Sequence, residues 1–299
     1  MNKKTKINYF GGPTYEKEDL MNMDPELLRA LLRERVHHNI EVPFYSFINK
    51  WNGEPKTNFG LQAQLALDVW KERGFTEDDE DIRWAEGYCE FAKKVRAGEK
   101  IDWQKPPHQA FSEEEIKVID RLIQERCSIR NWINKPVPDS MINKILEAGR
   151  AAPIGCNLDE LRFIVLKDPK KIEMIWSDTH VENAIIIVIC YDKRIPKVVG
   201  QDRSVPQNPG YDAAAAADHM LLMAHALGLG GVWLSKVAKS EKRKDTGEEF
   251  REKYGLPEYI EVALHIAVGW PALGTIKTQR MPLSNMVISR DLFREKSKN

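Results

Sequence analysis

The sequence predicts a chain with a helical N-terminal part, followed by a larger part that combines helices with strands. Helical spacing of apolar residues dominates up to residue 110. From residue 112 onward, helical segments are interspersed with short apolar runs. One of these runs, Ala184 to Cys190, contains no polar residue, which is typical of a strand covered on both faces. We therefore expect two domains, residues 1–110 and residues 111–299.

Three helices are predicted in the N-terminal part. The first begins at Asp24-Pro25, where an N-cap side chain precedes a proline in the first turn. The other two run from about Leu61 to Arg73 and from about Asp78 to Arg96. Four tryptophans indicate that this part packs on its own core or on the rest of the chain, or that it forms a wall of a substrate site or a dimer arm: Trp51, Trp70, Trp84 and Trp103.

The remaining elements follow from capping and from apolar runs. Ser112 opens a capping box for a helix that ends near Arg126, and a further helix begins at Pro138. The segment Asp212 to Leu227 has almost no polar face, so we expect a buried helix. Strands are expected at Leu161–Leu166, Ala184–Cys190, Gly230–Leu234 and Val262–Val268.

Composition excludes several classes of protein. The formal net charge is +0, so no overall electrostatic attraction to nucleic acid or to an anionic membrane is expected. No apolar run is long enough to span a bilayer, and no apolar signal core follows the basic start. The four cysteines, Cys89, Cys127, Cys156 and Cys190, form no C-x-x-C pair, which favours free thiols in a cytoplasmic protein over a metal site.

The segment Glu125 to Trp132 carries the strongest local chemistry. Arg126, Ser128 and Arg130 place two guanidiniums and a hydroxyl within five residues, a donor set suited to phosphate. An alternative remains open, because basic residues at the end of a helix also interact favourably with the helix dipole.

Two other patterns do not support a site. Gly228 to Gly231 follows a helix and precedes a strand, the reverse order of a dinucleotide-binding turn. We interpret Gly228 as a helix C-cap and Gly230-Gly231 as a close approach of the backbone to a neighbour. His219 and His225 are six residues apart, so they point in different directions from one helix and are not expected to share a metal.

Several segments, taken in order, resemble the FMN-dependent nitroreductase family. They are Arg126 to Arg130, Ala152 to Asn157, Asp212 to Leu234, Val268 to Pro271, and Lys277 to Pro282. The chain differs from the common family pattern at Asp159-Glu160-Leu161 and at Ser235-Lys236, and the segment from Asp192 to Gly210 is short for a substrate lid. Residues 1–110 resemble no family that we can name.

The resemblance implies an α+β sandwich, in which helices flank a mixed, mostly antiparallel sheet, with two FMN sites at the interface of a homodimer. The first motif would hold the FMN phosphate, ribityl chain and pyrimidine edge through Arg126, Cys127, Ser128 and Arg130. The turn that approaches the flavin from the other subunit would be Pro153, Ile154, Gly155 and Asn157. The isoalloxazine would be lined by Trp233, Leu234 and Ser235. The phosphate clamp would be completed by Lys277 and Arg280. The resemblance identifies no catalytic side chain and no metal ligand.

The function that the resemblance implies is an NAD(P)H oxidoreductase with a ping-pong mechanism. Its acceptor would be a nitroaromatic, a quinone, an activated alkene or a halogenated phenol. One alternative is a flavin-fragmenting or reductively dehalogenating enzyme whose N-terminal helices close the site. Another is a non-catalytic flavin-binding regulatory protein.

Overall fold

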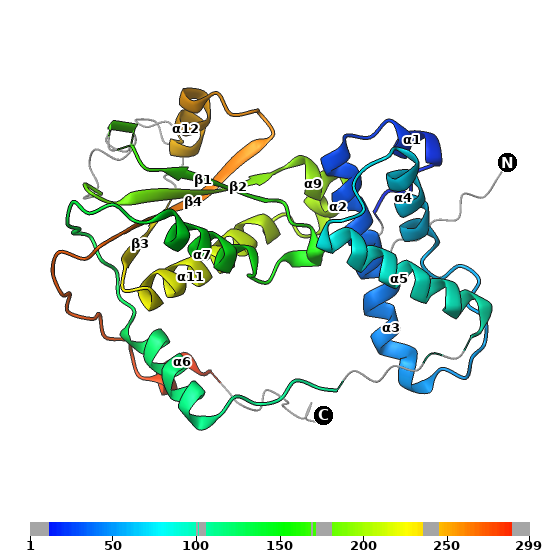
Figure 1. The fold of residues 1–299 in the computed structure, drawn as a ribbon, viewed down its shortest axis with the longest axis horizontal. Coiled ribbons are helices and arrows are strands. Elements are labelled where there is room, and N and C mark those ends of the chain that lie inside the picture. The colour runs from blue at the N-terminus through cyan, green and yellow to red at the C-terminus, as the bar shows by residue number, and fades with distance from the viewer. Residues whose placement is uncertain are drawn as a thin grey trace, which may run out of the picture.

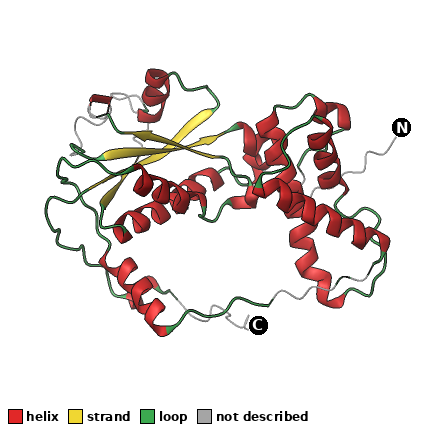
Figure 2. Cartoon of the chain, viewed as in Figure 1, coloured by secondary structure: helices red, strands yellow, loops and turns green. Residues whose placement is uncertain are grey.

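The fold is α+β, as predicted. The computed structural model describes residues 12–99, 101, 106–168, 170–171, 181–235 and 245–288, so Trp103 and Lys236 lie outside the described residues. One half of the molecule contains an antiparallel sheet with its helices, and the other half contains helices alone (Figures 1 and 2). The sheet has the strand order β1-β2-β4-β3.

The four strands agree with the predicted segments: β1 (Leu161–Leu166), β2 (Ile185–Asp192), β3 (Gly230–Ser235) and β4 (Ile260–Gly269). All neighbouring strands are antiparallel, with Ile164 opposite Val188 and Val232 opposite Ala267. The central strand β2 is buried along most of its length, as its uninterrupted apolar run predicts.

Helices cover both faces of the sheet. Ile185, Ile187 and Ile189 of β2 pack in one core with α7 (Asp139–Arg150) and α11 (Asn208–Ala226). The alternate residues of β2 pack in a second core with Phe250 of α12 (Thr246–Tyr254). Because successive side chains of a strand point to opposite faces, this alternation gives three layers (Figure 1).

The N-terminal half consists of short and medium helices around α2 (Pro25–Val36). These helices are α1 (Lys17–Met21), α3 (Val42–Phe47), α4 (Leu61–Glu72) and α5 (Glu80–Ala97), with π-helical η1 (His37–Glu41) and 3-10 helical η2 (Ile48–Lys50). Trp70 is buried in their common core, and Trp84 packs against it. Packing of the tryptophans on their own core is therefore confirmed for these two.

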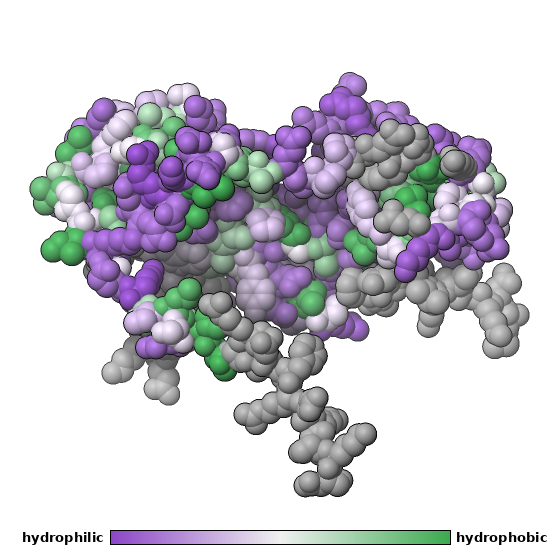
Figure 3. All heavy atoms as spheres, turned by 90° about the horizontal axis from the view of Figure 1, so that it is seen from below, coloured by the Kyte–Doolittle hydropathy of each residue, from purple (hydrophilic) through white to green (hydrophobic). Residues whose placement is uncertain are grey.

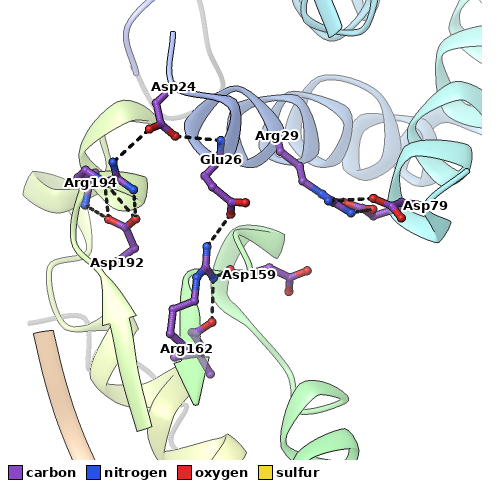
Figure 4. Close-up of polar contacts among 10 residues, drawn as sticks. Asp24, Glu26, Arg29, Asp79, Asp159, Arg162, Asp192 and Arg194 are labelled. Atoms are coloured by element: carbon purple, nitrogen blue, oxygen red, sulfur yellow. Dashed lines mark hydrogen bonds and ion pairs between the residues drawn. The ribbon is translucent and has the colours of Figure 1, made fainter. Parts of the chain in front are cut away.

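The two halves share one hydrophobic core. Leu158, Ile195 and Val199, which belong to the C-terminal half, are buried in the same cluster as the leucines of α2. Ion pairs cross the same junction: Glu26 pairs with Arg162 at 2.9 Å and Asp24 pairs with Arg194 at 3.4 Å (Figure 4). The N-terminal helices therefore pack on the rest of this chain.

The segment from Asp192 to Gly210, which is short for a substrate lid, belongs to this junction. It forms α9 (Arg194–Val198) and α10 (Gln201–Ser204), and α9 packs against α2. Tyr15 donates a hydrogen bond to the Val198 carbonyl at 2.7 Å, which is a further contact between the two halves.

Among the α-helices that the structure describes, two have no buried side chain. They are α6 (Glu113–Glu125), which begins with the predicted capping box at Ser112, and α13 (Leu283–Met286). Figure 1 shows α6 set apart from the sheet. In the part of the chain that the structure describes, no helix is sufficiently long and apolar to cross a membrane.

Candidate functional site

Three cationic side chains from two distant segments line one cavity. Arg126 is the C-cap of α6, while Lys277 and Arg280 lie in the irregular segment after β4. The cavity has a volume of about 440 Å³ and is also lined by Ile123, Gln124, Cys127, Ser128, Asp218, Leu222 and Thr278. Lys277 Nζ lies 3.4 Å from Gln124 Oε1, which ties the later segment to α6. Sequence positions about 150 residues apart therefore meet at one place.

The chain after α6 runs beside the edge strand β3, and this places Ser128 at the cavity. Ser128 forms a parallel bridge with Gly231, and Ile129 N donates to the Gly231 carbonyl at 3.0 Å. Ile129 is buried, so the alternation along this extended segment leaves Ser128 on the cavity side.

Gly230 and Gly231 permit this close approach, as the sequence indicated. A Cβ atom on Gly230 would lie 2.6 Å from Ile129 Cγ1, and one on Gly231 would lie 2.6 Å from Leu221 Cδ2. A larger residue at either position would require these neighbouring side chains to shift. Gly228 has φ +78 after the end of α11, which agrees with its interpretation as a C-cap.

A second cavity of about 400 Å³ adjoins the first and shares Arg126 and Cys127 with it. The Cys127 thiol lies 2.9 Å from the Thr275 hydroxyl. All four cysteines are free, as predicted. Cys89 and Cys190 are buried and line neither cavity.

Eight residues of the predicted flavin site line neither of these cavities, and four of them lie at this edge of the sheet: Arg130, Trp233, Leu234 and Ser235. Arg130 and Ser235 are exposed, and Trp233 retains 37% of its accessible surface. They lie on the two extended segments at this edge of the sheet, next to the residues that do line the cavities.

The predicted turn Pro153, Ile154, Gly155 and Asn157 occupies another place, at the start of α11. The turn includes the short 3-10 helix η3 (Gly155–Asn157). The Gly155 backbone N–H donates a hydrogen bond to Asp212 Oδ1 at 3.0 Å. Asp212 and the cavity-lining Leu222 are ten residues apart on α11, hence about 15 Å along the helix axis. Within one chain, the Asn157 turn and the cavity that contains the cations therefore lie at separate positions along α11.

A buried carboxyl pair lies beneath this turn. Glu160 is completely buried, and neither of its oxygens nor Asp212 Oδ2 has a hydrogen-bond partner among the described residues. Burial, followed by the neighbouring Asp212, raises the pKa of Glu160 to about 8. A protonated Glu160 can donate a hydrogen bond to Asp212 Oδ2, which otherwise has no donor. This hydrogen bond stabilises the Asp212 carboxylate, whose other oxygen accepts from Gly155 N.

Asn157 is held by the N-terminal helices. Arg33 of α2 donates from Nη2 to Asn157 Oδ1 at 2.8 Å and from Nε to the Asn157 carbonyl at 3.2 Å. The same guanidinium pairs with Asp159 Oδ2 at 2.7 Å and with Asp81 Oδ2 at 3.2 Å.

Comparison with known proteins agrees with this architecture. The family model described as "Nitroreductase family" matches residues 123–195 and 201–270. A protein of Archaeoglobus fulgidus, provisionally named NADH dehydrogenase/NAD(P)H nitroreductase, is 33% identical over 156 residues, which span 50% of this chain and 84% of that protein. The chain belongs to the nitroreductase family.

Other members of the nitroreductase family resemble the same part of the chain. An NADH dehydrogenase of Thermus thermophilus is 28% identical and covers 56% of this chain and 93% of its own length. Among solved structures, an FMN-dependent nitroreductase of Clostridium difficile is 25% identical, with a TM-score of 0.47, and covers 58% of this chain and 98% of its own. The family match begins at residue 123, so the N-terminal half lies wholly outside it.

Several residues around the candidate site could not be predicted from the sequence. Arg33 lies 124 residues before Asn157, and no local pattern links them. Glu160 and Asp212 are ordinary acidic residues in sequence, although the departure from the family pattern at Asp159-Glu160-Leu161 was a signal for Glu160. Asp218 is a single acidic residue within the apolar helix α11, and no sequence pattern indicates that it lines a cavity.

Proposed function

We propose that this nitroreductase-family chain is an FMN-dependent oxidoreductase that uses NAD(P)H to reduce a small organic acceptor. The convergence of Arg126, Lys277 and Arg280 on one cavity is the observation that supports this most strongly. Membership of the family and the family's motif order in the sequence support it independently. We expect the acceptor to be a nitroaromatic, a quinone, an activated alkene or a halogenated phenol.

The donor set of the cavity fits the FMN phosphate. A phosphate carries about two negative charges near neutral pH. Three cations face one carboxylate, Asp218, in the lining, so the cavity favours an anion. The cations are needed here, because the C-terminal end of α6 carries partial negative charge that would repel a phosphate. Ser128 adds a hydroxyl donor at the same wall.

The remaining contacts would come from the edge of the sheet and from the turn. In this proposal Trp233, Leu234 and Ser235 line the isoalloxazine, and the Asn157 turn approaches it from a second copy of the chain. Bound FMN supplies hydride and electron transfer, whereas the protein supplies binding, orientation and electrostatics. We identify no catalytic side chain, because this chemistry needs none beyond those that orient the two substrates.

We further propose that the chain forms a homodimer with composite sites. The apolar side chains Ile116, Ile119 and Ile123 of α6 are 53%, 40% and 53% exposed, and Ile276 is 99% exposed. Figure 3 shows hydrophobic surface on the protruding part of the molecule that α6 forms. A second copy would cover this surface, which is costly to leave in water.

Steady-state oxidation of NADH and NADPH, measured with a panel of acceptors, tests the proposed activity. We expect turnover that depends on FMN and on the acceptor, with the parallel-line kinetics of a ping-pong mechanism. Loss of the flavin itself during the reaction, or release of halide as the only turnover with any acceptor of the panel, would instead indicate the specialised enzyme. Bound FMN without any turnover would contradict the proposal and favour a regulatory flavoprotein.

A further inference from the structure

The turn that carries Asn157 has an unfavourable backbone conformation. Cys156, Asn157 and Asp159 have φ values of 57, 57 and 53, in the left-handed region, and none of them is a glycine. Asparagine and aspartate enter this region at a modest cost, but three such residues so close together, one of them Cys156, persist only where surrounding contacts support them. The contacts that hold this turn are therefore part of its structure.

Several of these contacts come from the N-terminal helices. Arg33 contacts both the backbone and the side chain of Asn157, and it also pairs with the Asp159 carboxylate. Leu158, between these two residues, is 3% exposed and lies in the core of the N-terminal helices. Leu158 therefore inserts into the N-terminal half, and Arg33 binds the residues on either side of it, Asn157 and Asp159.

Arg33 also determines how the Asn157 amide is oriented. A guanidinium has donors and no acceptor, so the group that faces it at 2.8 Å must be the Asn157 oxygen. The Asn157 Nδ2 donor is then directed away from Arg33. The Arg33 side chain is itself fixed, because it is only 11% exposed and its Nη1 pairs with Asp81 of α5.

We propose that Arg33 is a positioning residue for the flavin site. Through Arg33, the N-terminal helices hold the Asn157 turn in the shape in which Asn157 binds FMN. The inference rests on the proposed function, and it gives the N-terminal half a direct role in cofactor binding. It also explains why this half shares a core with the turn and does not stand apart from it.

Arg29 provides a matched control. It lies one turn earlier on the same face of α2, and it also pairs with Asp81. It also pairs with Asp79, at 3.0 Å, and its guanidinium lies over the Trp70 ring. Figure 4 shows Arg29 directed toward Asp79, away from Asp159 and Arg162. Arg29→Met therefore removes a comparable ion pair from the same helix and leaves the turn untouched.

The experiment is titration of the apo-protein with FMN, carried out on the full chain. Arg33→Met and Arg33→Lys should raise the dissociation constant of FMN about tenfold or more, since lysine keeps the charge but cannot form the forked contacts. Arg29→Met should leave it within about twofold of the wild-type value, because this change removes no contact to the turn. In an Asn157→Ala background, the Arg33 substitutions should have no further effect, because Arg33 acts through Asn157.

Several outcomes would overturn the proposal. One is wild-type affinity in the folded Arg33 variants. Another is an equal loss of affinity with and without Asn157, which would indicate a general structural effect. If Arg33→Met does not fold, Arg33→Lys decides, since it retains a cation beside Asp81 and Asp159. A wild-type chain that binds no FMN would overturn the proposed function as well, whereas wild-type binding with unchanged Arg33 variants would overturn this proposal alone.

Discussion

At the scale of single residues, the protonation of Glu160 should make stability depend on pH. Its pKa is raised from 4.5 to about 8 by burial and by Asp212, with a smaller contribution from Asp159. The folded state therefore retains a proton that the unfolded state loses above about pH 4.5. The stability that this proton provides is complete below that pH and is lost progressively as the pH rises to about 8.

Glu160→Gln should remove this dependence, because an amide can donate to Asp212 at every pH. We expect the free energy of unfolding of the wild type, relative to the variant, to fall by up to about 1.4 kcal/mol per pH unit between pH 5 and 8. Denaturant unfolding at several pH values measures it. Glu147→Gln, at an exposed ion pair, is the control and should show no such slope. If the difference in the free energy of unfolding between the wild type and Glu160→Gln stays constant over this pH range, Glu160 is not protonated in the folded state.

The cations of the cavity lead to a second prediction at this scale. Arg280→Ala or Arg126→Ala should weaken FMN binding by about 1.5–3 kcal/mol, the usual value of a hydrogen bond to a charged group. Titration with FMN by fluorescence measures this loss. Lys117→Ala, which removes an exposed cation of α6 outside the cavity lining, should have no effect. Unchanged affinity in both arginine variants would show that the phosphate binds elsewhere.

At the scale of elements, α6 buries none of its apolar side chains within the described part of the chain. Ile116→Glu or Ile119→Glu should place a charge in the proposed dimer interface and shift the protein toward monomer. Sedimentation velocity measures the change. Lys117→Glu, on the neighbouring face of the same helix, should leave the assembly intact. If the wild type sediments as a flavin-loaded monomer, the proposed interface does not exist.

The elements are also where sequence reasoning succeeded best. The capping box at Ser112, the apolar run from Ala184 and the glycine after α11 are local patterns, and each produced the expected element. The cavity cations could be found because the family motif order links segments far apart in the sequence. Contacts without a motif could not be predicted: Arg33 reaches Asn157, and Glu160 faces Asp212, only because the folded chain places them together.

At the scale of the whole molecule, we propose that residues 1–110 form an extension that supports the site of the C-terminal domain. Deleting residues 1–105 would expose Leu158, Ile195 and Val199, which are now buried against α2. We expect the truncated protein to lose solubility or to change its acceptor selectivity, although the cavity cations all lie after residue 125. Expression yield and the acceptor panel measure these effects. A soluble truncated protein with unchanged FMN affinity and acceptor profile would mean that the extension is an independent module.

The central claim is that this chain is a flavoprotein reduced by NAD(P)H. The most direct test is the visible absorption spectrum of the purified full chain, recorded after incubation with FMN and desalting, and again after anaerobic addition of NADH or NADPH. We predict a retained flavin band that is lost when one of the two nucleotides is added. A protein that remains colourless after incubation with FMN would contradict the claim.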